Sequence, residues 1–273
     1  MSDYELLDSG DGRKLERLGK YLIDRPSAQA FWKKSESEKF WEKADGIFYR
    51  KEENIWEYRS KIPERLVITH CGYNFLIKFT DFGHIGIFPE HEKSMEIIKK
   101  YSTTKNFKLL NMFAYTGAAT IAGSKAGATV THLDASQKIN DWAKENIILN
   151  NLETKSVRWI TDDVIKFLKR EVKRGSKYDG IILDPPTFGR GSKGEVFKIE
   201  NDINLLLELC KSILTENYKY LILSCHTPGF TPMVLKNLLL SHFKQPENTF
   251  AEELYLRGKN FNLPSGSIAY IIR

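Results

Sequence analysis

The sequence lacks the features of a membrane or secreted protein. No part of it approaches the roughly eighteen consecutive apolar residues that a transmembrane helix needs, so we expect no membrane partner. Its start, Met-Ser-Asp-Tyr-Glu, is polar and acidic, which argues against a secretory signal. Three widely spaced cysteines, Cys71, Cys210 and Cys225, form neither a disulfide framework nor a Cys-x-x-Cys metal site. We therefore expect a cytoplasmic protein that holds no metal.

Composition and charge are those of an ordinary globular protein. Of the 273 residues, 41% are hydrophobic and 28% are charged, and the chain contains no internal repeat. These values fit one large domain, or a core domain with a smaller appendage. The net charge of +6 allows a polyanionic partner such as RNA but does not require one. The oligomeric state stays open.

The composition and hydrophobic pattern of the sequence change near residue 100. Residues 1–100 are rich in Trp, Tyr, Lys and Glu, with short β-like runs at 46–50 and 66–80, so we expect a small, mostly β N-terminal domain. Residues 101–273 alternate apolar strands with helices, which predicts an α/β domain whose parallel sheet is covered on both faces. The expected strands are 109–113, 129–134, 157–160, 178–183 and 218–224, followed by a hairpin of 249–255 and 267–272. Sheets of this kind bind ligands beyond the carboxyl ends of their strands.

The first strand end carries a single glycine, Gly117, in the loop of residues 113–117. A dinucleotide fingerprint would need Gly-x-Gly-x-x-Gly, because two glycines make room for a pyrophosphate. The missing glycine therefore favours a ligand with a nucleoside but no phosphate. A plain turn between a strand and a helix is the alternative for this segment.

Acidic residues follow the second and third expected strands. Asp134 comes 17 residues after Gly117, where a carboxylate can accept hydrogen bonds from both hydroxyls of a ribose. Asp162 and Asp163 follow the third strand, where they could meet an adenine amino group or cap the next helix. One of these two acids can cap the helix while the other binds a ligand.

The fourth strand ends in the most specific pattern, Asp184-Pro185-Pro186-Thr187-Phe188. Two prolines fix the backbone as it leaves the sheet, so we expect Asp184 and the proline carbonyls to face the cleft. Phe188 offers a flat face on which a base could stack. The fifth strand ends in Cys225, which is either a nucleophile or inert packing, and His226 follows it.

Together these residues resemble the class I S-adenosylmethionine-dependent methyltransferases. The resemblance is closest to ribosomal RNA methyltransferases that carry an Asn-x-Phe-x-Tyr-Thr-Gly first motif and an Asp-Pro-Pro-x-Phe fourth motif, some of which methylate C5 of cytosine in large-subunit RNA. It covers residues 109–225 densely. The resemblance implies a Rossmann-like, doubly wound sheet of seven strands with an antiparallel last strand, and S-adenosyl-L-methionine as cofactor.

The resemblance also assigns roles to individual residues. It implies that the cofactor is bound by Phe113, Tyr115, Thr116, Gly117, Asp134, Ala135, Asp162, Asp163 and Asp184. It implies that Asp184 and Cys225 are catalytic, and that Pro185, Pro186 and Phe188 contact the substrate base.

Two chemistries are open for the methyl acceptor. The C5 atom of cytosine is a poor nucleophile, so a thiolate must first add at C6, and Cys225 would be that nucleophile. A base nitrogen needs no adduct. In that case Asp184 and the proline carbonyls would steer the attacking group, and Cys225 would be packing.

RNA is the favoured substrate for three modest reasons: the basic charge, the 12% aromatic content and a glycine-rich loop at residues 189–194. Six basic residues between 166 and 177 also share a helical face, although a solvated helix face is the favoured explanation for them. A non-catalytic RNA-binding or ribosome-assembly module is the non-enzyme alternative. A nicotinamide-dependent dehydrogenase is disfavoured by the missing second glycine.

Overall fold

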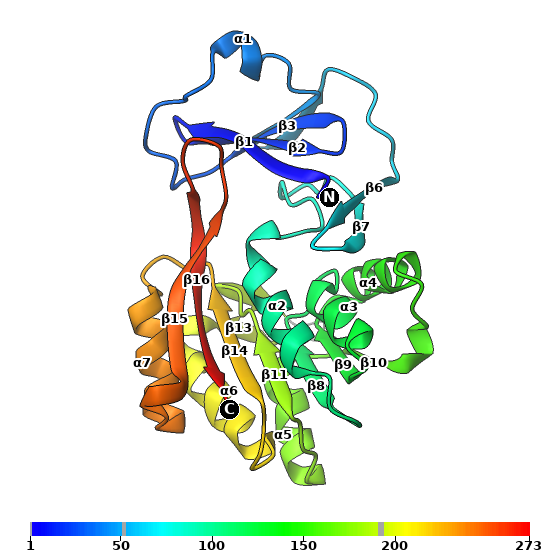
Figure 1. The fold of residues 1–273 in the computed structure, drawn as a ribbon, viewed down its shortest axis with the longest axis vertical. Helices are drawn as coiled ribbons and strands as arrows, with labels where there is room; N and C mark the ends of the chain where they lie inside the picture. The colour runs from blue at the N-terminus through cyan, green and yellow to red at the C-terminus, as the bar shows by residue number, and fades with distance from the viewer. Residues whose placement is uncertain (1, 51–52, 191–193) are drawn as a thin grey trace. The chain divides into compact units, whose positions relative to one another are not determined.

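The computed structural model describes residues 2–50, 53–190 and 194–273, and the chain forms two compact units (Figure 1). The first unit comprises Met1–His91 and Leu254–Ser265, and the second comprises Glu92–Glu253 and Gly266–Arg273. Residues 191–193 of the expected glycine-rich loop lie outside the described residues. Among the described residues, none of the helices has both the length and the apolar character to cross a membrane.

The boundary between the units falls after residue 91, not after residue 100. Helix α2 (Glu92–Tyr101) buries Met95, Ile97 and Ile98 and contacts α3 (Ala118–Lys125) in the second unit. Its amphipathic pattern therefore serves the core of the α/β unit. The chain then returns to the first unit near its end, because residues 254–265 belong there.

The main sheet of the first unit has five strands in the order β1-β2-β3-β4-β5. Strands β3 and β4 run parallel, and the other neighbouring pairs are antiparallel. The sequence predicted β4 and the separate β6–β7 hairpin but not β1, β2, β3 or β5. The elements are β1 (Tyr4–Gly10), β2 (Arg13–Leu18), β3 (Tyr21–Pro26), α1 (Glu38–Trp41), β4 (Gly46–Arg50), β5 (Asn54–Tyr58), β6 (Leu66–His70), β7 (Tyr73–Ile77) and a 3-10 turn at Pro89–His91.

A buried ion pair joins β2 and β3 in this unit. The Glu16 side chain is fully buried, and Arg25 donates to both of its carboxylate oxygens, at 2.7 and 2.8 Å. The Tyr4 hydroxyl donates to Oε1 at 2.9 Å, and Lys14 Nζ lies 3.1 Å from the same oxygen. Burial alone would raise the pKa of Glu16, but Arg25 and Lys14 outweigh it and hold that pKa at about 2.

The second unit is built on the expected seven-stranded sheet, in the order β10-β9-β8-β11-β14-β16-β15. Five strands are parallel, and β16 is antiparallel to β14. The strands are β8 (Lys108–Met112), β9 (Thr129–Asp134), β10 (Val157–Thr161), β11 (Gly180–Leu183), β14 (Tyr220–Cys225), β15 (Thr249–Leu256) and β16 (Leu263–Ile272). The α/β fold class predicted from the sequence is confirmed.

Helices cover both faces of this sheet (Figure 1). Besides α2 and α3 they are α4 (Gln137–Leu149), α5 (Val164–Arg174), α6 (Ile199–Ile213) and α7 (Pro232–Phe243). Helix α6 contacts both α5 and α7, and the three enclose a large apolar cluster with β11 and β14. A short hairpin, β12 (Phe188–Arg190) and β13 (Val196–Lys198), precedes α6 and was not predicted.

Candidate functional site

The carboxyl ends of four neighbouring parallel strands are level with one another. One row of register partners crosses them: Leu133 on β9, Met112 on β8, Leu183 on β11 and Leu223 on β14. The residues that follow this row therefore share one edge of the sheet, and they are Asp134, Phe113, Asp184 and Ser224. Three of the four were predicted as site residues, and Ser224 was not.

The loop after β8 has an unusual backbone. Phe113, Tyr115 and Gly117 all have positive φ, at +53°, +46° and +88°. Such a conformation costs free energy for residues with a Cβ and persists only where surrounding contacts hold it. Asn146 on α4 provides one such contact, since its Nδ2 donates to the carbonyl of Thr116 at 2.9 Å. The loop is thus a rigid turn that leads into α3.

Asp134 ties the end of β9 to this loop. Its Oδ2 accepts the backbone N–H of Tyr115 at 3.0 Å, and its Oδ1 accepts that of Ser136 at 3.0 Å. Burial raises the pKa of Asp134, against the lowering effect of these amides and of the Ala135 amide. A carboxylate oxygen has room for further donors, so Asp134 can still accept hydrogen bonds from a ligand.

A buried network of hydrogen bonds between Asn111, Thr120 and His132 was not predicted from the sequence. Asn111 Nδ2 donates to Thr120 Oγ1 at 2.9 Å, and that hydroxyl lies 2.8 Å from His132 Nδ1. His132 is fully buried, and burial lowers its pKa to about 3, so its ring is neutral at physiological pH. Asn111 therefore acts inside the fold, where it joins β8 to the first turn of α3.

Asp162 and Asp163 already make local contacts. Asp163 Oδ1 accepts the backbone N–H of Lys166 at 2.8 Å and so caps α5. Asp162 Oδ1 accepts the backbone N–H of Asp163 at 2.9 Å, and its Oδ2 pairs with Arg170. The capping alternative raised for this pair is thus realised by Asp163.

Asp184 is oriented by the neighbouring strand. Ser224 Oγ donates to Asp184 Oδ1 at 2.8 Å, and His226 Nε2 lies 3.7 Å from the same oxygen. The loop that contains Pro185 and Pro186 is joined to the loop after β14 by a 2.7 Å hydrogen bond between the hydroxyls of Thr187 and Thr227. The loop after β11 is therefore held at both of its ends.

Cys225 points to the opposite face from Ser224. Side chains alternate along a strand, and Cys225 packs with Leu221 and Leu223 in the apolar cluster under α6 and α7. It is 1% exposed, and burial raises the pKa of its thiol. The backbone N–H of Thr227 donates to its Sγ at 3.4 Å. In this arrangement Cys225 is a buried thiol and not a thiolate.

Phe188 is 47% exposed on β12, and the Arg190 guanidinium lies 5.7 Å from its ring centre. A half-exposed ring of this kind can stack on a base, as the sequence predicts.

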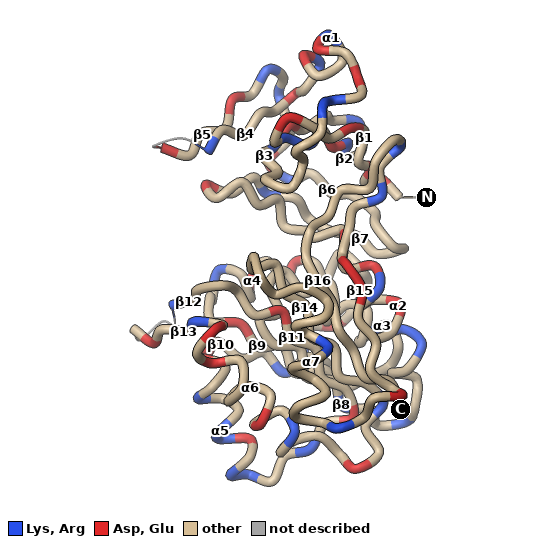
Figure 2. The backbone as a smooth tube through the Cα atoms, turned by 90° about the vertical axis from the view of Figure 1, so that its left-hand side faces the viewer, with Lys and Arg blue, Asp and Glu red and all other residues tan. Residues whose placement is uncertain are grey.

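Three of the six basic residues between 166 and 177 are paired with acids. Figure 2 shows the Lys and Arg segments along α5. Lys166 pairs with Glu195, Arg170 with Asp162 and Arg174 with Glu171. These pairs favour the interpretation of this stripe as a solvated helix face.

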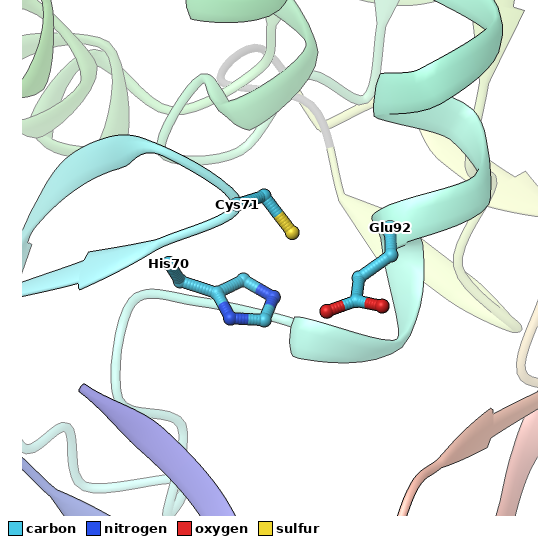
Figure 3. Close-up of side chains that lie close together, drawn as sticks. All are labelled: His70, Cys71 and Glu92. Carbon is cyan, nitrogen blue, oxygen red and sulfur yellow. The ribbon is translucent and has the colours of Figure 1, made fainter. Parts of the chain in front are cut away.

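The exposed cysteine, Cys71, lies at the turn of the β6–β7 hairpin, next to His70 (Figure 3). Both ring nitrogens of His70 have partners in the first unit: Nδ1 lies 3.1 Å from Ser2 Oγ, and Nε2 lies 3.3 Å from the carbonyl oxygen of Pro89. A carbonyl only accepts, so Nε2 is the donor in its contact with Pro89. His70 is therefore engaged in holding the hairpin.

Comparison with known proteins gives a consistent result. The model of a family described as S-adenosylmethionine-dependent methyltransferase matches residues 13–247. A crystal structure of a SAM-dependent methyltransferase from Agrobacterium tumefaciens is 36% identical, covers 99% of this chain and 90% of that chain, and has a TM-score of 0.94. SMU.776, solved in complex with SAH, shares the fold at 20% identity, with a TM-score of 0.79 over 100% of this chain and 76% of that one.

Among curated proteins, the ribosomal RNA large subunit methyltransferase K/L of Hahella chejuensis is 36% identical over 186 residues, which is 66% of this chain. The chain spans only 25% of the length of that relative. These matches agree with the resemblance drawn from the strand-end motifs.

Proposed function

The chain belongs to the S-adenosylmethionine-dependent methyltransferase family, and on this premise we propose that it transfers a methyl group from S-adenosylmethionine to a base of ribosomal RNA. The observation that carries the proposal is the row of side chains at one sheet edge, in which Asp184 follows directly after Asp134 and the 113–117 loop.

The residues at this edge fit the cofactor. A Cβ at Gly117 would lie 3.3 Å from the Cβ of Ala143, so glycine lets the loop backbone lie close against α4. The partly buried carboxylate of Asp134 accepts the N–H of Tyr115 in this loop and would accept the ribose hydroxyls. Phe113, Tyr115, Thr116 and Ala135 would line the same pocket, with Asp162 or Asp163 near the adenine. When bound, the cofactor supplies an activated methyl group.

The contacts of Asp184 support a base nitrogen as the acceptor. Ser224 orients the Asp184 carboxylate. Each carboxylate oxygen has two lone pairs, so the group can accept a further hydrogen bond from an amino or ring N–H group of a base. Pro185 and Pro186 would present their carbonyls beside it, and Phe188 would support the base outside its stack. The chain would thus orient a nitrogen lone pair towards the methyl group and exclude water.

The surroundings of Cys225 argue against the cytosine C5 alternative. A covalent adduct needs a thiolate at the edge of the sheet, whereas Cys225 is buried in an apolar cluster that raises the pKa of its thiol. We therefore assign Cys225 to packing.

The choice of ribosomal RNA rests on the names of the curated relatives and on the basic charge of the chain. A cytoplasmic location is part of the proposal, and the three free cysteines suit a reducing compartment.

The proposal is tested by methyl transfer in vitro. Purified protein is incubated with methyl-labelled S-adenosylmethionine and with RNA from a strain that lacks the gene, and the labelled nucleotide is identified by mass spectrometry. We expect label in ribosomal RNA on a base nitrogen, and none with the Asp184→Asn variant. RNA binding without any methyl transfer or cofactor binding would instead support the non-catalytic module.

A further inference from the structure

The first unit contains a groove of about 470 Å³ that the proposed methyl transfer does not use. Its walls come from the end of β5, the segment that follows it, and the end of β7, and they include Tyr58, Lys61, Pro63, Glu64, Lys78 and Phe79. All of these residues belong to the first unit. The groove lies within the range of volumes that small ligands occupy in proteins.

An aromatic stack forms one wall of the groove. Tyr58 lies parallel to Trp56, with ring centres 6.0 Å apart and an interplanar angle of 12°, and Phe79 meets both rings edge-on. Trp56 is fixed by a 2.8 Å hydrogen bond from its Nε1 to the carbonyl of Thr80. Tyr58 nevertheless remains 50% exposed. One ring is therefore held in place from behind and open to solvent, so a planar ligand could stack on it at little cost in side-chain entropy.

Two lysines line the same groove as the Tyr58 ring. Lys61 and Lys78 both line the groove, and Glu64 is the acidic residue among its lining residues. Lys61 is exposed, and within the described part of the chain no carboxylate pairs with it. The groove thus combines an open aromatic face with an ammonium group that can meet a phosphate.

We propose that this groove binds one unpaired nucleotide of an RNA, with the base stacked on Tyr58 and the phosphate contacted by Lys61 and Lys78. The inference rests on the proposed function, because it assigns part of the recognition of the RNA substrate to the first unit. Stacking on an aromatic ring tolerates any base, so the groove would recognise single-stranded RNA and not a particular sequence.

The test measures binding of a labelled single-stranded oligouridylate to the full chain by fluorescence anisotropy, at several salt concentrations. We expect Tyr58→Leu to weaken binding about fivefold to tenfold. Lys61→Gln should lower the slope of log affinity against log salt by about 0.7, as expected for one phosphate contact on a single strand. Glu64→Gln removes the competing negative charge and should tighten binding.

Two control variants match these changes outside the groove. Phe31→Leu alters an aromatic residue that is 91% exposed in the first unit, and Lys105→Gln removes an exposed charge from the second. Neither should change the affinity by more than about twofold or the salt slope by more than about 0.2.

Three outcomes would overturn the groove assignment: no binding of oligouridylate, equal binding by the groove and control variants, or binding of a proline-rich peptide in place of the oligonucleotide. The same preparations are assayed for methyl transfer to RNA, which separates the two proposals. If methyl transfer persists and the groove variants bind RNA normally, only the proposal for the groove is rejected. Weakened binding by the groove variants without any methyl transfer supports the groove and rejects the proposed activity.

Discussion

Ser224 Oγ donates a hydrogen bond to Asp184 Oδ1 at 2.8 Å, from one strand end to the next. A hydrogen bond to a charged group is worth about 1.5–3 kcal/mol, so this one fixes the orientation of the carboxylate that we propose contacts the acceptor. Ser224 therefore positions Asp184 without touching the cofactor loop.

Replacing Ser224 by Ala should lower kcat about tenfold to a hundredfold, because Asp184 loses its orienting donor. The affinity for S-adenosylhomocysteine should stay unchanged, since Asp134 and the 113–117 loop are intact. Steady-state kinetics and calorimetry measure the two effects. Ser241→Ala, on the exposed part of α7, is the control and should leave both quantities as they are. Equal turnover in the two variants would contradict a positioning role.

Cys225→Ala distinguishes the two acceptor chemistries. If Cys225 is packing, turnover should stay within about threefold of the natural chain, and unfolding should become easier by about 1 kcal/mol. Cys210→Ala is the matched control, since Cys210 is buried in the same apolar cluster but lies on α6. A loss of turnover confined to Cys225→Ala would revive the covalent mechanism.

Gly117 and Gly127 offer a matched pair of substitutions. Their φ angles are +88° and +90°, so an alanine at either position meets similar backbone strain, of about 1 kcal/mol. At Gly117 the added Cβ would also press on Ala143, whereas at Gly127 it would meet nothing within 4 Å. We expect Gly117→Ala to weaken cofactor binding at least about fivefold and Gly127→Ala less than about twofold, as measured by calorimetry. Similar affinities would mean that the loop does not contact the cofactor.

His132 makes stability depend on pH. Burial lowers its pKa from 6.5 to about 3, so below pH 6.5 the unfolded chain takes up a proton that the folded chain does not. Stability should therefore fall as the pH falls, by up to about 1.4 kcal/mol per pH unit from this residue. His132→Gln should remove that slope between about pH 6.5 and 5, where urea unfolding can measure it. Between about pH 7 and 8 the two chains should show the same slope, because His132 is neutral in both states.

Glu16 should dominate the acid sensitivity of the first unit. Its pKa of about 2 lies below the ordinary value of 4.5, so the stability that it contributes is lost as the pH falls through this interval. Glu16→Gln leaves Arg25 buried without its counter-charge and should cost about 3 kcal/mol in urea unfolding. Glu5→Gln breaks an exposed pair with Arg17 and should cost less than about 1 kcal/mol. If the two substitutions lowered the free energy of unfolding equally, the buried ion pair of Glu16 would contribute no more to stability than an exposed one.

The α/β unit was predictable because its elements repeat a simple pattern. The alternation of apolar strands with helices predicted β9 with its observed bounds. The family expected from the strand-end motifs is confirmed. The individual site roles stay predictions, which the variants above address.

Other features could not be predicted because they depend on contacts between residues that lie on different elements. The segment of β2, Arg13–Leu18, alternates charges with leucines and looks like a surface, yet Glu16 is buried because Arg25 on β3 neutralises it. Ser224 was passed over for Cys225 because a uniformly apolar strand does not reveal which face each side chain takes. The hydrogen-bond network through Thr120 and His132 joins residues 12 apart on different elements.

The final hairpin has a consequence for how the protein is made. Leu256 and Leu263 on β15 and β16 pack with Leu6 and Ala30 in one apolar cluster of the first unit. Leu6 and Ala30 can therefore be buried only after the leucines more than two hundred positions later in the chain have been made. During synthesis the first unit cannot complete this cluster until Leu263 has left the ribosome. A premature stop within the hairpin would leave an early-made β-sheet with an exposed apolar surface.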